Sequence, residues 1–195
     1  MYNFDVINDR SNTNCLKFDF AKENNMPDDL VSMWIADMDF MAPECISDAL
    51  REYVNKGIFG SSDPKDDYYE VVIAWFKKHF DWEIKKEWIV KTPGVVIALA
   101  LAVKAFTQKG EAVIIQPPVY YPFYNVIRNN ERKIIESPLV YKDGAYSIDF
   151  EDFENKIKEN NVKLFIMCSP HNPVCRVWTK EELKNDLLLM KKLNI

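Results

Sequence analysis

The first thirty residues show no periodic pattern of apolar positions. Two polar stretches within them, "NDRSNTN" (8–14) and "ENNMPDD" (23–29), are rich in the asparagine, aspartate and proline that mark loops. We therefore expect residues 1–30 to form an extended arm. The next stretch, "LVSMWIADMDF" (30–40), predicts a short strand that ends in a turn.

Two segments before residue 88 have apolar residues at helical spacing. Residues 42–57 predict one helix, which Gly57 should end. Residues 63–80 predict another, with Asp63 as its N-cap and Pro64 at its first helical position.

From residue 88 onward, short apolar runs alternate with helical patterns. The runs predict strands at 88–92, 111–118, 132–140 and 162–170. Helices are predicted between and after them, at 94–110, 119–130, 149–161 and 179–195. The helix 94–110 is mostly apolar, so we expect it to be buried on most sides. This alternation indicates an α/β fold with a largely parallel sheet.

The last predicted helix has a defined start. Thr179 is the expected N-cap, and Glu182 follows three residues later, which is the pattern of a capping box. The sequence therefore fixes the beginning of this helix from local signals alone.

Composition narrows the classes of protein further. The chain has 195 residues, 48% hydrophobic and 28% charged, which is ordinary for a globular protein with one large domain or slightly more. A net charge of −5 gives no basic surface for nucleic acid or anionic membranes. The four cysteines and two histidines have no zinc-site spacing. Absence of paired cysteines favours a reducing, cytoplasmic location, and the apolar run 95–103 is too short to span a bilayer.

Three predicted strands end in stretches that carry proline and polar or small residues. In open parallel sheets, ligands bind beyond these carboxyl ends. At "TPGVV" (92–96), Gly94 precedes a helix whose free backbone N–H groups suit a phosphate, although such a glycine also occurs in ordinary turns. Neither a GxGxxG nor a Walker A pattern is present, so dinucleotides and nucleoside triphosphates lack support.

The other two strand ends offer an aromatic ring and an amide. A tyrosine of "PPVYYPFY" (117–124) can stack on a flat cofactor or simply pack in the core. Asn172 of "SPHNP" (169–173) can donate a hydrogen bond to an anionic oxygen or occupy a common proline turn.

Two carboxylates stand close together in "WIADMDF" (34–40). Asp37 and Asp39 are two positions apart, and paired carboxylates can perform acid–base chemistry. On an extended segment their side chains would point to opposite sides, so we expect a structural hydrogen-bonding role instead.

These motifs, together with "GIFG" (57–60) and "SPHNPVCRVWTKEEL" (169–183), occur in an order that resembles a known family. It is the class I/II aminotransferase group of fold-type I pyridoxal-phosphate enzymes, in particular its cystathionine β-lyase (MalY/PatB-like) branch. The resemblance implies a three-layer large domain with an incomplete, mainly parallel sheet flanked by helices. It also implies an N-terminal arm (1–30), a partial small domain (31–87) and the first part of the cofactor-binding domain (88–195).

The resemblance also implies roles for individual residues. Tyr120 would stack on the pyridine ring of pyridoxal 5′-phosphate, and Asn172 would bind its phenolic oxygen. Ala36 would lie near the substrate carboxylate. The cofactor phosphate would be held by the backbone of Gly94, Val95 and Val96. The implied chemistry is α,β-elimination from a sulfur-containing amino acid, or transamination, with a homodimer or a complementary C-terminal fragment as partner.

The chain departs from the family at several points. It resembles only an N-terminal half, and it lacks the lysine that forms the Schiff base, since Lys65 stands in a different context. No catalytic residue is therefore assigned, and the chain alone should be inactive. Ser61 stands where the branch has a tyrosine, and Cys175 replaces a glycine of the family motif. If that glycine had positive φ, the cysteine would add strain on the order of 1 kcal/mol.

The missing half also affects the expected fold. In the family sheet, three strands absent here separate the segment 88–92 from the other three, so strand edges and an apolar face should stay open. Two other functions remain open from the sequence. One is a non-catalytic binding or interaction protein derived from such an enzyme. The other is an unrelated doubly wound domain that binds a different phosphate compound.

Overall fold

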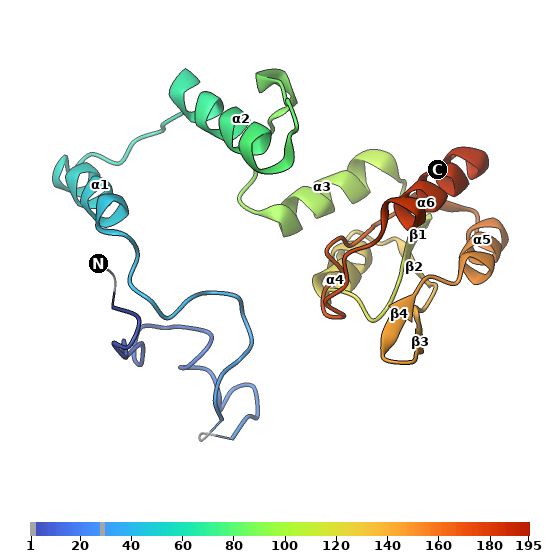
Figure 1. Cartoon of the computed structure of the whole chain (residues 1–195), viewed down its shortest axis with the longest axis horizontal. Coiled ribbons are helices and arrows are strands. Elements are labelled where there is room, and N and C mark those ends of the chain that lie inside the picture. The colour runs from blue at the N-terminus through green and yellow to red at the C-terminus, as the bar shows by residue number, and fades with distance from the viewer. Residues whose placement is uncertain (1–2, 28–29) are drawn as a thin grey trace. The chain divides into compact units, whose positions relative to one another are not determined.

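The computed structural model describes residues 3–27 and 30–195 (Figure 1). The chain divides into two compact units, Met1–Asp67 and Tyr68–Ile195, called here the first and second unit. The α-helices are α1 (Glu44–Asn55), α2 (Asp66–Phe80), α3 (Val95–Phe106), α4 (Pro122–Asn129), α5 (Phe150–Glu159) and α6 (Lys180–Leu193). The strands are β1 (Ala112–Ile115), β2 (Lys133–Glu136), β3 (Val140–Lys142), β4 (Ala145–Ser147) and β5 (Val162–Phe165). The finer division at residues 30 and 87 stays a prediction.

The first unit contains α1 and irregular segments. Gly57, with φ 67°, follows the end of α1 in the left-handed conformation, as expected of a helix stop. The predicted strand at 30–40 is wrong, because the described part of this segment forms bends with no ladder partner. Ile35 has φ 58°, which interrupts any extended run.

The second unit is built on a parallel sheet with the strand order β2-β1-β5. Every residue of β1 is buried, as expected for a central strand covered on both faces. The predicted parallel α/β class is therefore confirmed. Each of these strands is shorter than its predicted run, because the prolines and polar residues at the run ends do not join the ladder.

Alternate residues of β1 point to opposite faces of the sheet and separate two cores. Val113 and Ile115 pack with α3 and α4 on one face. Ala112 and Ile114 pack with α5 and α6 on the other. The unit thus has the three layers that the family resemblance implies: helices, sheet, helices (Figure 1).

Two expectations around residue 88 are wrong. The segment 88–92 is not a strand: a short 3₁₀ helix occupies Lys86–Trp88, and no strand lies beside the residues that follow. A strand needs a hydrogen-bonded neighbour, and among the described residues this segment has none. The helix predicted at 94–110 ends at Phe106, and only Val103 of α3 is buried, so it is not buried on most sides.

Local capping signals decide the other helix starts. Asp149 accepts hydrogen bonds from the backbone N–H groups of Glu151 and Asp152 at the start of α5. The capping box of α6 is present, with Thr179 and Glu182 bonded reciprocally. The N-cap predicted at Asp63 is wrong, since α2 begins at Asp66. Acidic residues in its first turn favour that position through the helix dipole.

One element was not predicted. β3 and β4 form an antiparallel hairpin whose turn residues, Asp143 and Gly144, have φ values of 52° and 80°. The Asp-Gly pair is a strong hairpin signal that the apolar pattern alone does not reveal. In the part of the chain that the structure describes, no helix is both long and apolar enough to cross a membrane.

Candidate functional site

The N-terminus of α3 is the first part of the candidate site. Gly94 precedes it with φ 155° and ψ 163°, a conformation open essentially to glycine alone. The first intrahelical bond runs from the N–H of Ala98 to the carbonyl of Gly94. The N–H groups of Val95 and Val96, at the first helical positions, therefore have no acceptor within the helix. No side chain caps this end, so it presents donors and a positive dipole end to an anion.

Tyr120 and Asn172 follow the carboxyl ends of β1 and β5, which are neighbours in the sheet. Because these strands are parallel, both residues lie beyond the same edge. α3 runs into the start of β1 and packs against β5, so its N-terminus also lies toward this edge. Tyr120 is half-buried at the rim of the core, whereas Asn172 is exposed. The carboxamide of Asn172 makes no hydrogen bond to a described residue, so it is available to a ligand.

His171 joins the two loops that carry these residues. Its imidazole Nε2 lies 3.0 Å from the carbonyl oxygen of Pro118, on the loop after β1. The side chain is 1% exposed, and its ring meets Trp178 edge to face at 5.3 Å. Burial lowers the pKa of His171, so the neutral ring is favoured at neutral pH. His171 thus fixes the loop of Asn172 against the loop of Tyr120.

The stretch "SPHNPVCRVW" is held by several further contacts. The backbone N–H of His171 donates to the carbonyl of Arg176 at 2.7 Å and closes the loop. The indole N–H of Trp178 donates to the carbonyl of Cys168 at 2.9 Å. Arg176 lies over the Trp178 ring at 4.3 Å and pairs with Glu182 at 2.7 Å. The peptide bonds Ser169–Pro170 and Asn172–Pro173 are cis.

Cys175 occupies a left-handed position in this loop. Its φ is 54°. A positive φ at this position was the condition for the strain predicted from the sequence, because a β-carbon is unfavourable there. Its thiol is exposed and donates a weak hydrogen bond to the carbonyl of Pro173 at 3.4 Å. Nothing in these contacts gives the thiol a base to activate it.

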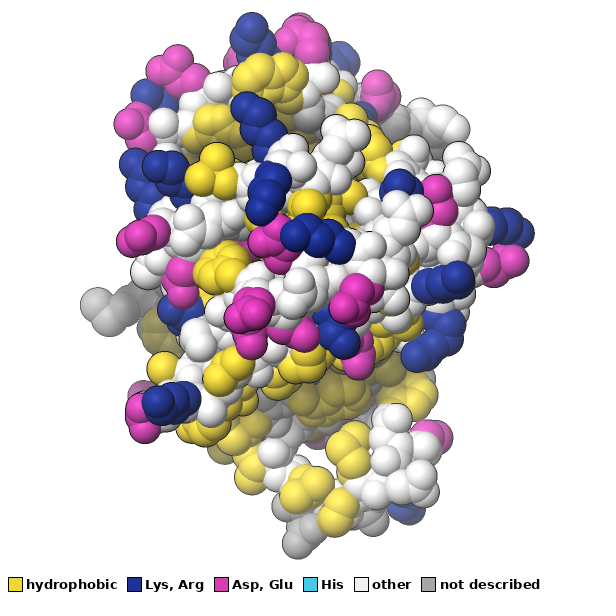
Figure 2. All heavy atoms as spheres, turned by 90° about the vertical axis from the view of Figure 1, so that its right-hand side faces the viewer, with side chains coloured by type: hydrophobic (Ala, Val, Ile, Leu, Met, Phe, Trp, Pro, Cys, Tyr) yellow, Lys and Arg dark blue, Asp and Glu magenta, His cyan; other side chains and the backbone are white. Residues whose placement is uncertain are grey.

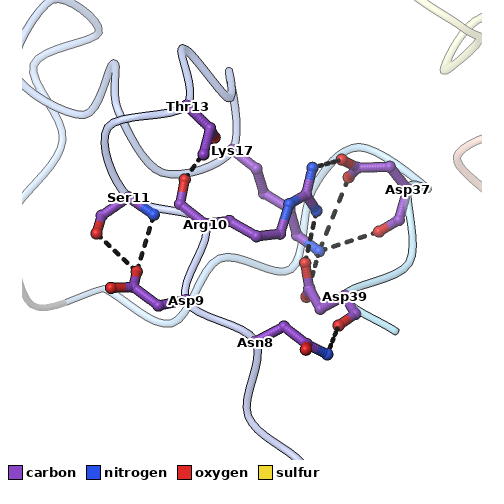
Figure 3. A network of polar contacts seen from close by, with 8 residues as sticks. All are labelled: Asn8, Asp9, Arg10, Ser11, Thr13, Lys17, Asp37 and Asp39. Atoms are coloured by element: carbon purple, nitrogen blue, oxygen red, sulfur yellow. Dashed lines mark hydrogen bonds and ion pairs between the residues drawn. The ribbon is translucent and has the colours of Figure 1, made fainter. Parts of the chain in front are cut away.

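The two aspartates of "WIADMDF" share one ionic network in the first unit (Figure 3). Arg10 bonds both Asp37 and Asp39, the latter at 2.6 Å, and Lys17 lies 2.9 Å from Asp39. The hydrogen bonds that Lys17 and Arg10 donate lower the pKa of Asp39. The expected structural role agrees with this geometry. The prediction of opposite directions is wrong, because the bend at Ile35 and beyond turns both carboxylates toward the same cations.

Ala36 lies in the same bend of the first unit and is exposed. The sites of Gly94, Tyr120 and Asn172 belong to the second unit. The position of Ala36 near a substrate carboxylate therefore stays a prediction. Ser61 is likewise an exposed residue of the first unit.

A cavity of about 540 Å³ lies elsewhere, at the outer edge of β2. Tyr124, Arg128, Glu136 and Lys156 contribute to its lining, and none of the predicted site residues does. Burial and a hydrogen bond with Glu136 raise the pKa of Tyr124 to about 12, so this phenol stays protonated. The candidate site is therefore distinct from this cavity and lies at the carboxyl ends of β1 and β5.

Sequence reasoning missed His171, Arg176 and Trp178 as supports of the site. All three lie within ten residues of one predicted strand end, and Trp178 is one of only five tryptophans. A buried tryptophan with its N–H bonded, next to a proline-rich turn, is the signal that could have found them.

Comparison with known proteins identifies the family of the chain. The sequence profile of a family described as aminotransferase class I and II matches residues 28–195. Cystathionine beta-lyase PatB of Bacillus subtilis is 46% identical over 181 residues, covering 93% of this chain and 47% of PatB. The chain belongs to the class I and II aminotransferase family. This family depends on pyridoxal phosphate as its cofactor.

Solved structures support the same assignment. Cystalysin from Treponema denticola, which contains pyridoxal 5′-phosphate, has a TM-score of 0.88 and 40% identity. The match covers 98% of this chain and 49% of the cystalysin chain. The pyridoxal-phosphate-bound C–S lyase of Staphylococcus hominis has a TM-score of 0.90 and 37% identity, covering 100% of this chain with 50% of its own. The chain thus spans about half the length of the relatives it matches, and it corresponds to their N-terminal half.

Proposed function

We propose that this chain forms the cofactor-holding half of a pyridoxal-phosphate-dependent enzyme of amino-acid metabolism. The reaction of the whole enzyme is carbon–sulfur lysis of an amino acid, with transamination as the alternative. The observation that carries the proposal is the open end of α3 behind Gly94, at the same sheet edge as Tyr120 and Asn172. We further propose a cytoplasmic location and a homodimer for the whole enzyme.

The residues present fit the cofactor. The α3 N-terminus, with the N–H groups of Val95 and Val96, suits a phosphate dianion. A β-carbon added at Gly94 would have no other atom within 4 Å, so there is open space beside the backbone at this position. Tyr120 offers a ring, and Asn172 offers amide donors for the phenolic oxygen. When bound, pyridoxal phosphate supplies an electron sink for the carbanion formed at the substrate Cα.

The chain's own residues hold and orient, and none moves the substrate proton. Among the lysines near the site, Lys91 lies over the ring of Tyr69 at 5.9 Å. Lys104 lies ten positions beyond Gly94, or about 15 Å along the helix. The amine of Lys91 is thus directed to Tyr69, and Lys104 is too far along the helix to present an amine at the carboxyl ends of the strands. We therefore propose that residues 1–195 alone bind the cofactor and do not turn over substrate.

Equilibrium dialysis with pyridoxal 5′-phosphate tests this function. The chain should bind it more tightly than phosphate-free pyridoxal, and inorganic phosphate should compete. Asn172→Ala should weaken binding by about tenfold, because one charge-assisted hydrogen bond is lost. Asn185→Ala is the matched control, since Asn185 is exposed on α6 and away from the strand ends.

Two results would contradict the proposal. Equal affinity for pyridoxal and pyridoxal phosphate would remove the role of the α3 N-terminus. Release of pyruvate from cystathionine by residues 1–195 alone would show that the chain does contain a functional amine.

A further inference from the structure

The sheet has a free edge at β2. In the strand order β2-β1-β5, β2 pairs with β1 on one side, and no described strand lies on its other side. The backbone N–H of Lys133 donates to the carbonyl of Glu111 at 2.8 Å, and the N–H of Ser137 donates to the last residue of β1 at 3.0 Å. Because alternate residues of a strand face the same neighbour, Ile134 and Glu136 direct their N–H and C=O groups away from β1. These groups can pair with another strand.

The cavity of about 540 Å³ follows this edge and is called here the β2 groove. Its lining comes from three elements: Ile134, Ile135 and Glu136 of β2, Tyr124 and Arg128 of α4, and Lys156 and Asn160 of α5. Ile134 packs into the α3–α4 core and Ile135 into the α5–α6 core, so α4 and α5 lie on opposite faces of β2. The β2 groove is therefore an open strand edge between two helical walls, which is the shape that fits one extended segment.

Each wall of the β2 groove carries one cation. Arg128 on α4 is exposed and Lys156 on α5 is half-buried, and neither side chain pairs with a described residue. Glu136, the acidic residue of the lining, is already hydrogen-bonded with Tyr124. The net charge of the chain is −5, and Figure 2 shows basic and acidic side chains interspersed over one side of the second unit. Attraction of an acidic ligand therefore depends on these two cations and not on a general positive surface.

We propose that the β2 groove binds an extended acidic segment of a partner protein, which adds to the sheet as a further strand. Side chains of an added strand alternate between the two faces of the sheet. One acidic side chain then reaches Arg128 on the α4 wall, and the next one reaches Lys156 on the α5 wall. The groove should therefore select two adjacent acidic residues flanked by β-branched residues. Hydrogen bonds to the backbone of Ile134 and Glu136 supply affinity, and the two cations supply specificity.

A second copy of this chain is a poorer occupant of the β2 groove. Pairing of two β2 edges about a two-fold axis would bring α4 toward the same helix of the second copy, and α5 likewise. Arg128 and Lys156 would then each approach a like charge, which is destabilising across paired strands. The charges of the two walls therefore favour an acidic segment over a homodimer formed through this edge.

Fluorescence anisotropy with the 195-residue chain tests the proposal. The probe is a fluorescein-labelled peptide, Thr-Val-Asp-Glu-Val-Thr, and we expect saturable 1:1 binding. Replacing its two acidic residues by lysine should weaken binding by about tenfold, because both charge-assisted contacts are lost. Methylating the backbone nitrogens of the same two residues keeps their charges and removes the central donors of the strand, so it should also weaken binding by about tenfold.

Variants of the chain locate the peptide in the groove. Arg128→Gln and Lys156→Gln should each weaken binding of the acidic peptide by about fivefold. Lys184→Gln is the matched control, because Lys184 is exposed on α6 and does not line the groove. Circular dichroism should show the same helix content in all three variants, since neither Arg128 nor Lys156 pairs with a described residue.

Several results would overturn the proposal. Absence of saturable binding, or binding that ignores backbone methylation, would remove the added strand. Equal affinity for the acidic and lysine peptides would remove the role of the two cations. Competition by N-acetylaspartate as strong as by unlabelled peptide would assign the groove to small anions, and a dimer that the peptide dissociates in light scattering would assign the edge to a second copy. The proposed function stands apart from all of these outcomes, because no residue assigned to the cofactor lines the β2 groove.

Discussion

Replacing Cys175 by glycine should stabilise the folded chain. Cys175 has φ 54°, and its exposed thiol makes only one weak hydrogen bond, to Pro173. A residue with a β-carbon pays roughly 1–2 kcal/mol in the left-handed region. Glycine also makes the unfolded chain more flexible, which lowers the free energy of unfolding by about 0.4–1 kcal/mol and offsets part of this gain. The free energy of unfolding should therefore rise by roughly 0.5–1 kcal/mol.

Two further variants separate the β-carbon from the thiol. Cys175→Ala removes the sulfur and keeps the β-carbon, so its free energy of unfolding should stay within a few tenths of a kcal/mol of the original, about the size of a surface effect. Cys175→Asn should lie between alanine and glycine, because asparagine tolerates the left-handed conformation. Urea denaturation followed by circular dichroism measures all four proteins, and thermal midpoints should shift by about 1–4 °C in the same order. A glycine variant no more stable than the alanine variant would refute the reasoning.

Three other changes test the site and the buried charges of the second unit. His171→Ala should lower the free energy of unfolding by about 2–3 kcal/mol, because a buried ring against Trp178 and its hydrogen bond are lost; urea denaturation measures this. Asp186 is 2% exposed, and burial followed by the charge of Glu182 raises its pKa to about 7. The folded state therefore holds a proton that the unfolded state releases near pH 4, so stability should fall as pH rises from about 4 to about 7. Asp186→Asn should flatten that part of the stability-versus-pH curve, and an unchanged slope would contradict the assignment. Gly94→Ala should weaken binding of pyridoxal phosphate at least tenfold in dialysis while helix content stays the same, because alanine cannot keep φ at 155°.

The parts of the fold that the sequence predicted are those encoded by neighbouring residues. The capping box of Thr179 and Glu182 places the start of α6, and Gly57 ends α1, because both signals act within a few residues. The parallel α/β class follows from apolar runs that alternate with helical patterns. β1 is one such run, and all of its residues are buried. For the site, the strand ends of Tyr120 and Asn172 could be located from prolines and polar residues alone.

The parts that failed depend on contacts between distant segments. A strand at 88–92 needs a neighbour that no local pattern supplies, and in the described structure it has none. The shared direction of Asp37 and Asp39 depends on Arg10 and Lys17, which lie 20 or more residues earlier in the chain. The same holds for His171, whose partner Pro118 is 53 positions away.

On the proposed function, cofactor binding and substrate turnover would depend on different parts of the whole enzyme. The contacts that shape the site, from His171 to the Pro118 carbonyl and from Trp178 to the Cys168 carbonyl, lie within the second unit. They need no residue from the unmatched half of the relatives. Turnover needs an amine at the strand ends, and Lys104 is about 15 Å along α3 from Gly94. On the proposed function, residues 1–195 should therefore hold the cofactor by themselves, whereas turnover should need an amine that these residues do not bring to the strand ends.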